Sequence, residues 1–163
     1  MTDPALNLNG MQCSTHLSTP LVVVNGPARL ALGMNSGSNV FGQGNRANAT
    51  IGRAIRTHEC FAPRGANANF IAKTPSGIRV RTYERGVEGE TLSCGTGSVA
   101  AALAMVLNAR NQGADGRKTD YKVGVETQSG EALMVYFKMS AGKITDVWLE
   151  GGARIVFKGE FYV

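Results

Sequence analysis

The feature that most constrains this 163-residue chain is a long apolar segment near its middle. Residues 99–110 read Val-Ala-Ala-Ala-Leu-Ala-Met-Val-Leu-Asn-Ala-Arg, a run of strong helix formers that is apolar on almost every side. A helix without a polar face has to be covered by other elements, so the sequence predicts a buried central helix over 99–110. Residues 111–113, Asn-Gln-Gly, are expected to end it.

Short runs of β-branched or alternating residues elsewhere in the chain predict the strands that cover this helix. One such run, Leu-Val-Val-Val, follows Pro20, and another alternates Ile, Val and Thr with Arg, Arg and Tyr. The expected strands are residues 21–24, 70–72, 78–83, 122–127, 133–138, 144–149 and 155–162. Turn signals that predict hairpins lie at residues 75–77, 129–130, 141–142 and 151–152.

A second, shorter helix is predicted over residues 51–58, with Thr50 as its N-terminal cap. The face expected to be buried consists of Ile51, Ala54, Ile55 and His58. Residues 33–48 are rich in Asn, Gly and Ser and are expected to form a loop. Together these elements predict a single α+β domain over residues 1–163, in which a curved antiparallel or mixed sheet surrounds the central helix.

Composition limits the class of protein and its partners. Hydrophobic residues make up 43% of the chain and charged residues 18%, which is enough to bury a core. The net charge of +5 comes from dispersed Lys and Arg without a nucleic-acid-binding motif, so no nucleic-acid partner is expected. Three cysteines without a CxxC pair support neither a disulfide framework nor a metal site, which favours a reducing compartment. No apolar stretch approaches the ~18 residues that span a membrane, and no signal peptide is evident, so a cytoplasmic protein is expected.

The residues just before the central helix carry the chemistry. Cys94 follows Glu-Thr-Leu-Ser and precedes Gly-Thr-Gly, which leads directly into the helix. Glycines let the backbone approach a ligand closely, and the first free amides of a helix attract an anion. The same helix end favours thiolate over thiol, so the sequence predicts a lowered pKa for Cys94. The loop is therefore expected to bind an anion beside a reactive thiol.

Two charged residues, Glu84 and Arg85, end the preceding predicted strand. They are placed to face the same site and to bind the ammonium and carboxylate groups of a zwitterion. The structural alternative is that Cys94 is a small core residue and that Glu84 and Arg85 are a surface pair. Two glycines close behind a simple core cysteine, Gly95 and Gly97 at a helix start, have no packing role, which favours the functional interpretation.

These residues resemble those of a known family. Tyr-Glu-Arg-Gly over 83–86, followed by Gly-Glu-Thr-Leu-Ser-Cys-Gly-Thr-Gly over 89–97, closely resembles the second-cysteine motif of diaminopimelate epimerase, a cofactor-independent amino-acid isomerase. Residues 52–56 with 61–70, and 147–153 with 156–160, are similar to the family's segments before the hairpin and in its closing strands. The family-like part of the chain is residues 50–163, and the loop-rich residues 1–49 match poorly.

The resemblance implies a reaction and a set of roles. Diaminopimelate epimerases interconvert the LL and meso forms of their amino-acid substrate, in lysine and cell-wall biosynthesis, by thiol and thiolate acid–base chemistry. By this resemblance Cys94 and Glu84 would be catalytic, and no pyridoxal cofactor or metal is expected. The substrate-binding residues that it implies are Asn67, Glu84, Arg85, Gly95 and Thr96, with the amides of the last two holding the α-carboxylate.

The resemblance also implies a second half, because family members resemble two α/β halves with the site between them. The first half supplies another cysteine in a Cys-Gly-Asn-Gly setting, which neither Cys13 nor Cys60 has. Both are interpreted as packing or incidental residues. The chain is therefore interpreted as the C-terminal half of such an enzyme.

Three hypotheses stay open at this point. The first is half of an epimerase that acts with a complementary N-terminal half or self-associates as a homodimer. The second is a non-catalytic module that keeps the fold and recognises an amino acid or a partner. The third is a related two-base isomerase with another substrate.

Overall fold

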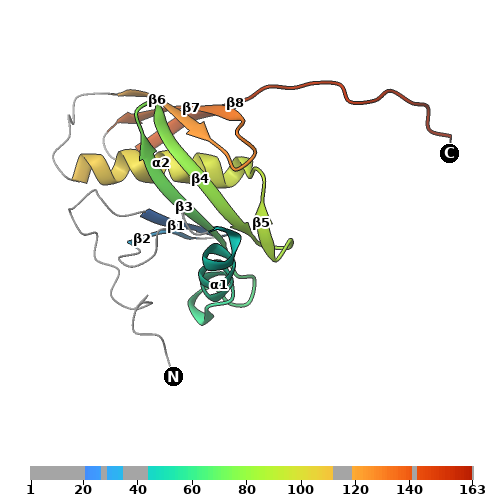
Figure 1. Ribbon diagram of the computed structural model, residues 1–163. Helices are drawn as coiled ribbons and strands as arrows, with labels where there is room; N and C mark the ends of the chain where they lie inside the picture. The colour runs from blue at the N-terminus through green and yellow to red at the C-terminus, as the bar shows by residue number, and fades with distance from the viewer. Residues whose placement is uncertain (1–20, 27–28, 35–43, 112–118, 141–142, 163) are drawn as a thin grey trace.

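The computed structural model describes residues 21–26, 29–34, 44–111, 119–140 and 143–162 (Figure 1). Its strands are β1 (Leu21–Gly26), β2 (Arg29–Met34), β3 (Asn67–Thr74), β4 (Gly77–Glu84), β5 (Gly89–Thr91), β6 (Asp120–Glu126), β7 (Ala132–Ser140) and β8 (Lys143–Glu150). Its helices are α1 (Gly44–Arg56), the 3-10 turn η2 (Glu59–Phe61) and α2 (Gly95–Asn111).

All eight described strands belong to one mixed sheet. Its order is β2-β1-β3-β4-β6-β7-β8, with β5 paired to β4 beside this path. Neighbouring strands are antiparallel except β4 and β6, which are parallel. A parallel pair needs a long crossover connection, and α2 lies in that connection. The predicted α+β fold class with a mixed sheet is confirmed.

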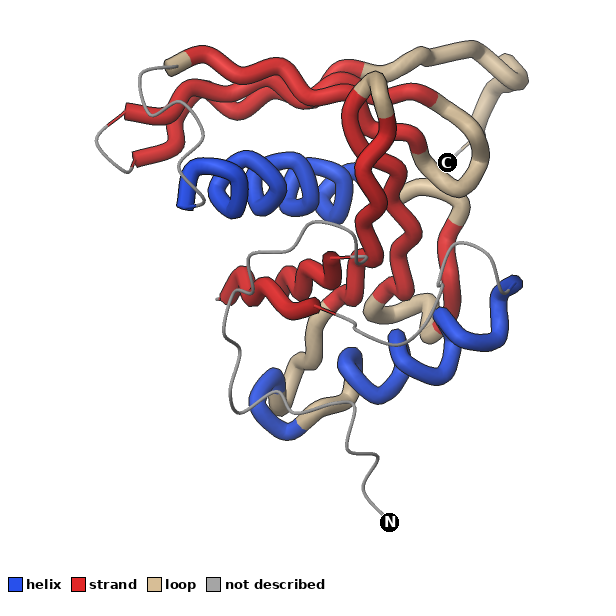
Figure 2. The backbone as a smooth tube through the Cα atoms, turned by 60° about the vertical axis from the view of Figure 1, so that its left-hand side comes forward, coloured by secondary structure: helices blue, strands red, loops and turns tan. Residues whose placement is uncertain are grey.

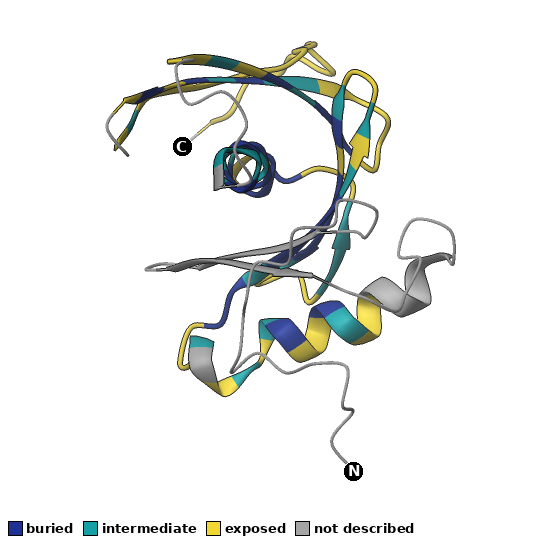
Figure 3. Ribbon diagram, turned by 90° about the vertical axis from the view of Figure 1, so that its left-hand side faces the viewer, coloured by how far each residue is buried: buried dark blue, intermediate teal, exposed yellow. Residues whose placement is uncertain are grey.

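Helix α2 lies inside the curve of this sheet, where Figure 3 shows it end-on. Its alanines Ala101, Ala102 and Ala104 are fully buried, and they pack with apolar residues of β3, β4, β6 and β7 in the main core cluster. The small alanine side chains allow close approach of helix and sheet on several sides. The prediction of a buried central helix is therefore confirmed. Neither α1 nor α2, the two α-helices of the described segments, is long and apolar enough to cross a membrane.

Helix α1 covers the opposite face of β3 and β4, below them in Figure 2. Ile55 packs there with Phe70 and Tyr83 in a second core cluster. Gly52 brings the helix close to the sheet, because a Cβ at this position would lie 2.5 Å from Tyr83 Cβ. The buried face thus includes Gly52, whereas Ala54, which was predicted to be buried, is exposed.

The start of α1 and the strand β2 differ from the sequence predictions. Thr50 lies inside α1, so its prediction as the cap was wrong, and α1 ends at Arg56 instead of continuing to residue 58. Residues 33–34 belong to β2 and 44–48 to α1, although all were predicted as loop. The ladder with β1 stabilises β2, whose own sequence has few β-branched residues. Residues 35–43 of the predicted loop lie outside the described segments.

The predicted strand over residues 155–162 was wrong. Residues 151–162 form no regular structure and extend away from the sheet (Figure 1). Five large apolar side chains in this C-terminal segment are 77–91% exposed: Ile155, Val156, Phe157, Phe161 and Tyr162. A β-strand needs a partner strand for its backbone groups, and this segment pairs with none of the described strands. The remaining predicted strands are all present, most of them one to three residues longer than predicted.

Candidate active site

Cys94 lies at the junction between β5 and α2. The Ser98 amide donates to the Cys94 carbonyl at 2.9 Å, which is the first hydrogen bond of the helix and makes Cys94 its N-cap residue. The Gly97 amide reaches the Cys94 sulfur, so the thiol occupies the place of a capping side chain. The predicted order of strand, loop, cysteine and helix N-terminus is confirmed.

Three polar side chains surround the Cys94 sulfur. The thiol donates to Glu84 Oε1 at 3.5 Å, and it contacts Thr96 Oγ1 at 3.6 Å. Asn67 Nδ2 approaches the sulfur at 4.0 Å. The residue as a whole is 93% buried, since only 7% of its surface is exposed. A buried thiol therefore faces a carboxylate, a hydroxyl and an amide at one helix end.

The pKa of the Cys94 thiol is raised, which corrects the prediction of a lowered value. Burial is the largest cause, because it disfavours the charged thiolate. The Thr96 hydroxyl and the Gly97 amide oppose it by donating to the sulfur, and the nearby Glu84 carboxylate raises the pKa further. The helix end acts in the predicted direction, but burial and the carboxylate outweigh it. The thiol is consequently the resting form at neutral pH.

Asn67, Glu84 and Arg85 come together where β3 begins and β4 ends. Asn67 Oδ1 accepts a hydrogen bond from the Arg85 backbone amide at 2.8 Å, so the Asn67 side chain joins both strands. Glu84 is half-buried beside the thiol, whereas Arg85 is exposed. The structure thus brings Asn67 and Glu84 to Cys94 and leaves the Arg85 side chain at the rim.

Two ion pairs hold the segment between β4 and β5 in place. Arg56 of α1 binds Glu88 in the turn, with Nη2 at 2.7 Å from Oε1. Arg81 and Glu90 form a bidentate pair on the α1 side of the sheet, and their side chains are only 6% and 10% exposed. Because Glu84 precedes this turn and Cys94 follows β5, these pairs fix the backbone that brings the carboxylate to the thiol.

Gly95 and Thr96 are exposed residues in the first turn of α2. The first amides of a helix have no partner within it, so those of Gly95 and Thr96 are available to an anion. Sequence reasoning missed Leu149 of β8, whose Cδ2 would lie 3.2 Å from a Cβ at Gly95. The family-like segment 147–153 contains this leucine, but local sequence does not place it beside Gly95, because β8 and α2 come together only in the folded protein.

The side chains of the other two cysteines lie outside the described part of the protein. Cys60 lies in η2, just past the C-terminus of α1, and nothing is described of its side chain. Cys13 lies outside the described segments. Within the described segments, no group of three or more His, Cys, Asp or Glu residues is placed to hold a metal ion.

The fold and the site define an α+β protein with a cysteine at a helix N-terminus beside a carboxylate. The sequence profile of diaminopimelate epimerase matches residues 40–146, which include every predicted site residue. The chain belongs to the diaminopimelate epimerase family.

Individual relatives support the same assignment. The chain is 47% identical over 110 residues to the diaminopimelate epimerase of Hydrogenobaculum sp. (strain Y04AAS1), covering 67% of this chain and 35% of the relative. The corresponding enzymes of Aquifex aeolicus and Chlorobaculum tepidum are each 44% identical, over 67% and 68% of this chain and 36% and 39% of their own lengths. The chain thus spans between a third and two fifths of these relatives. No solved structure matches it.

Proposed function

We propose that this chain supplies one face of the active site that inverts the α-carbon of diaminopimelate between its LL and meso forms. The observation that carries the proposal is the Cys94 thiol, held at the N-terminus of α2 between Glu84 and Thr96. Inversion through a planar carbanion requires one group to remove a proton and another to return one from the opposite face. Cys94 is the group on one face.

The protonation state of Cys94 assigns it the acid step in the resting protein. Burial and the Glu84 carboxylate keep the proton on sulfur, because both raise the thiol pKa. The thiol gives this proton to the carbanion and becomes a thiolate. The Gly97 amide and the Thr96 hydroxyl then donate hydrogen bonds to the thiolate. In the reverse direction the thiolate takes the α-proton and restores the thiol. Glu84 is a catalytic group because it contacts the sulfur that gives and takes this proton.

The substrate's polar groups are assigned to the residues around the thiol. The Gly95 and Thr96 amides hold the α-carboxylate and stabilise the charge that develops on it as the α-proton leaves. Glu84 and Arg85 bind the charged ends of the zwitterion. Asn67 positions this region, because its side chain accepts a hydrogen bond from the Arg85 amide and approaches the Cys94 sulfur. In this scheme side chains of the protein transfer the protons, and side chains and backbone amides bind the substrate.

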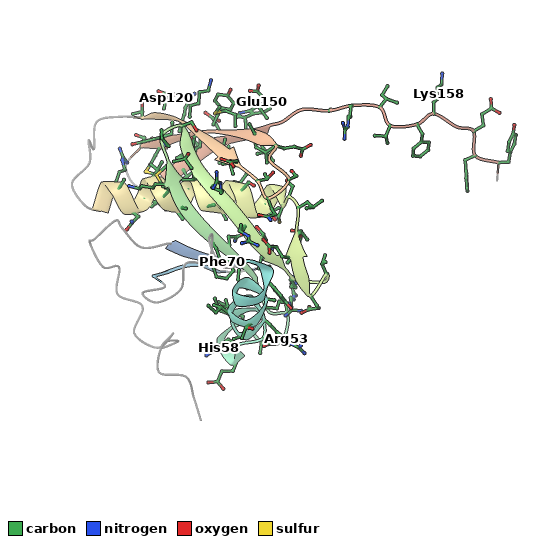
Figure 4. The ribbon with its side chains drawn as sticks, viewed as in Figure 1. Arg53, His58, Phe70, Asp120, Glu150 and Lys158 are labelled. Atoms are coloured by element: carbon green, nitrogen blue, oxygen red, sulfur yellow. The ribbon has the colours of Figure 1, made fainter. Side chains whose placement is uncertain are left out.

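The second acid–base group comes from a complementary half, and this chain associates with that half or with a second copy of itself. The C-terminal segment supports such an association, because its five large apolar side chains lie in solvent (Figure 4, where Lys158 marks the segment). Leu92, two residues before Cys94, is also 68% exposed. Exposed apolar side chains in this number are typical of an interface.

An exchange experiment tests the catalytic proposal. The chain is incubated with LL-diaminopimelate in D₂O, alone and with the separately expressed part of the Hydrogenobaculum relative that this chain does not match, and α-deuteration is followed by mass spectrometry. We expect exchange only when both polypeptides are present, and we expect its loss in Cys94→Ser. Absence of exchange in the combination, although the two polypeptides bind each other, would contradict the proposal.

A non-catalytic binding module is the second candidate, favoured by the resting thiol form of Cys94. Such a module binds diaminopimelate through the helix N-terminus and Asn67 and needs no ionised sulfur. Calorimetry together with the exchange experiment separates the two functions. A binding module in which Cys94 is replaced by Ala still binds the amino acid as well as the wild type does, and neither form exchanges the α-proton. An epimerase half exchanges the proton with its partner and loses that chemistry in Cys94→Ala.

Light scattering tests the association. The wild-type chain is expected to form a dimer or to bind the added complementary part, and Phe157→Asp with Phe161→Asp is expected to abolish either complex. Lys158→Ala with Glu160→Ala is the matched control, because it changes the same segment and keeps its apolar side chains. A wild-type chain that stays monomeric and does not bind the complementary part would refute the association.

A further inference from the structure

Two polar side chains are buried side by side under the first turns of α2. Asn69 of β3 is completely buried and Thr82 of β4 is 4% exposed. They are direct cross-strand partners, and Thr82 Oγ1 donates to Asn69 Oδ1 at 2.9 Å. Neither residue belongs to the substrate site described above.

In the sheet, Asn69 and Thr82 lie between the site and the apolar core. Side chains two residues apart on a strand share a face, so Asn69 and Thr82 form the row between two others. The outer row holds Asn67 and Glu84 beside the thiol, and the inner row holds the apolar pair Ile71 and Val80. Apolar residues fill the inner row, and a buried hydrogen-bonded pair adds only about 0.5–1.5 kcal/mol of net stability. A polar middle row is therefore not explained by stability alone.

Gly97 of α2 packs directly on this pair. A Cβ at Gly97 would lie 2.3 Å from Asn69 Oδ1 and 3.1 Å from Thr82 Oγ1, so only glycine fits at this separation. The amide of the same residue reaches the Cys94 sulfur. One residue thus links the buried polar pair to the thiol.

We propose that Asn69 and Thr82 are positioning residues that set the height of the first turn of α2 above β3 and β4. By fixing Gly97 they hold its amide against the Cys94 sulfur, and they keep that sulfur within reach of Glu84 and Asn67. The hydrogen bond between the two side chains fixes the orientation of the Asn69 amide on which Gly97 rests. Their importance for catalysis rests on the proposed function, whereas their effect on the thiol does not.

The test uses the pH profile of Cys94 alkylation by iodoacetamide, followed by peptide mass spectrometry without substrate. Thr82→Val keeps the shape of the side chain and removes the donor, whereas Thr82→Ser keeps the hydroxyl. We expect Thr82→Val to move the midpoint of the profile upward by about half a pH unit or more, because the thiolate loses its Gly97 donor. Thr82→Ser is expected to restore the wild-type midpoint.

Urea unfolding shows that each variant is folded before its thiol is compared with the wild type. Gly97→Ala is a second route to the same displacement, because its methyl group has no room over Asn69, and it decides the matter if Thr82→Val does not fold. An unchanged midpoint in a folded Thr82→Val or Gly97→Ala would overturn the proposal, as would equal shifts in Thr82→Val and Thr82→Ser. Failure of the substrate exchange experiment leaves this thiol profile unaffected, so the two proposals fail separately.

Discussion

The Cys94 thiol donates a hydrogen bond to Glu84 Oε1 at 3.5 Å, joining the N-terminus of α2 to the end of β4. The two residues are ten positions apart, and the short return through β5 brings them together. A carboxylate beside a thiol stabilises the protonated sulfur. This contact between two elements therefore adds to burial in keeping the proton on the sulfur, and it can be changed from either side.

Replacing Glu84 by Gln is expected to speed alkylation of Cys94. The variant removes the negative charge that raises the thiol pKa, so the pKa falls and the thiolate fraction at pH 8 rises. The labelling rate is expected to rise about threefold or more with the thiolate fraction. Iodoacetamide labelling with peptide mapping measures it, and Glu131→Gln, an exposed carboxylate elsewhere, is the control. Slower labelling of Glu84→Gln would contradict the assigned role of the carboxylate.

Replacing Thr96 by Val is expected to have the opposite effect. The Thr96 hydroxyl lowers the Cys94 pKa by donating to the sulfur, and valine removes that donor while keeping the shape. Labelling at pH 8 is expected to slow by about two- to fivefold. Thr96→Ser retains the hydroxyl and is expected to label at the wild-type rate. If Val and Ser variants label equally, the hydroxyl does not act on the thiol.

The raised pKa of Cys94 also predicts how stability depends on pH. The folded protein holds the thiol proton more tightly than the unfolded chain, so this contribution is complete below the unfolded pKa. It is lost as the pH rises through the folded pKa, because the unfolded chain releases its proton first. Urea midpoints are expected to fall more steeply between pH 8 and pH 10.5 in the wild type than in Cys94→Ala. Parallel curves would show that burial does not raise this pKa.

The buried ion pair between Arg81 and Glu90 predicts how single and double substitutions change the free energy of unfolding. Arg81→Leu leaves the Glu90 carboxylate buried without its partner and is expected to lower the free energy of unfolding by about 3–5 kcal/mol. Adding Glu90→Leu is expected to recover much of that loss, because no uncompensated charge remains. Urea unfolding of the two single variants and the double variant measures the coupling. Additive losses would show that the two charges act independently.

Local sequence determined the parts of this protein whose physics is local. The apolar run over 99–110 required a buried helix, whatever surrounded it. β-Branched, apolar or alternating runs, with the turn signals between them, predicted β1, β3, β4, β6, β7 and β8. The motif around Cys94 predicted a helix N-terminus, because glycines and a capping position are read from neighbouring residues. Membership of the family followed from the same motif, and the matched residues 40–146 contain it.

Tertiary structure decided the properties that depend on residues distant in sequence. The pKa of Cys94 rises where the helix end alone predicted a fall, since burial and the Glu84 carboxylate depend on how β4, β5 and α2 pack. The place of Leu149 beside Gly95, and of Gly97 on Asn69 and Thr82, likewise follows from sheet curvature. Residues 155–162 have a strand-like sequence but pair with none of the described strands, because pairing is a property of two segments. Sequence alone sets what each segment favours, whereas burial and partners arise only when the segments meet.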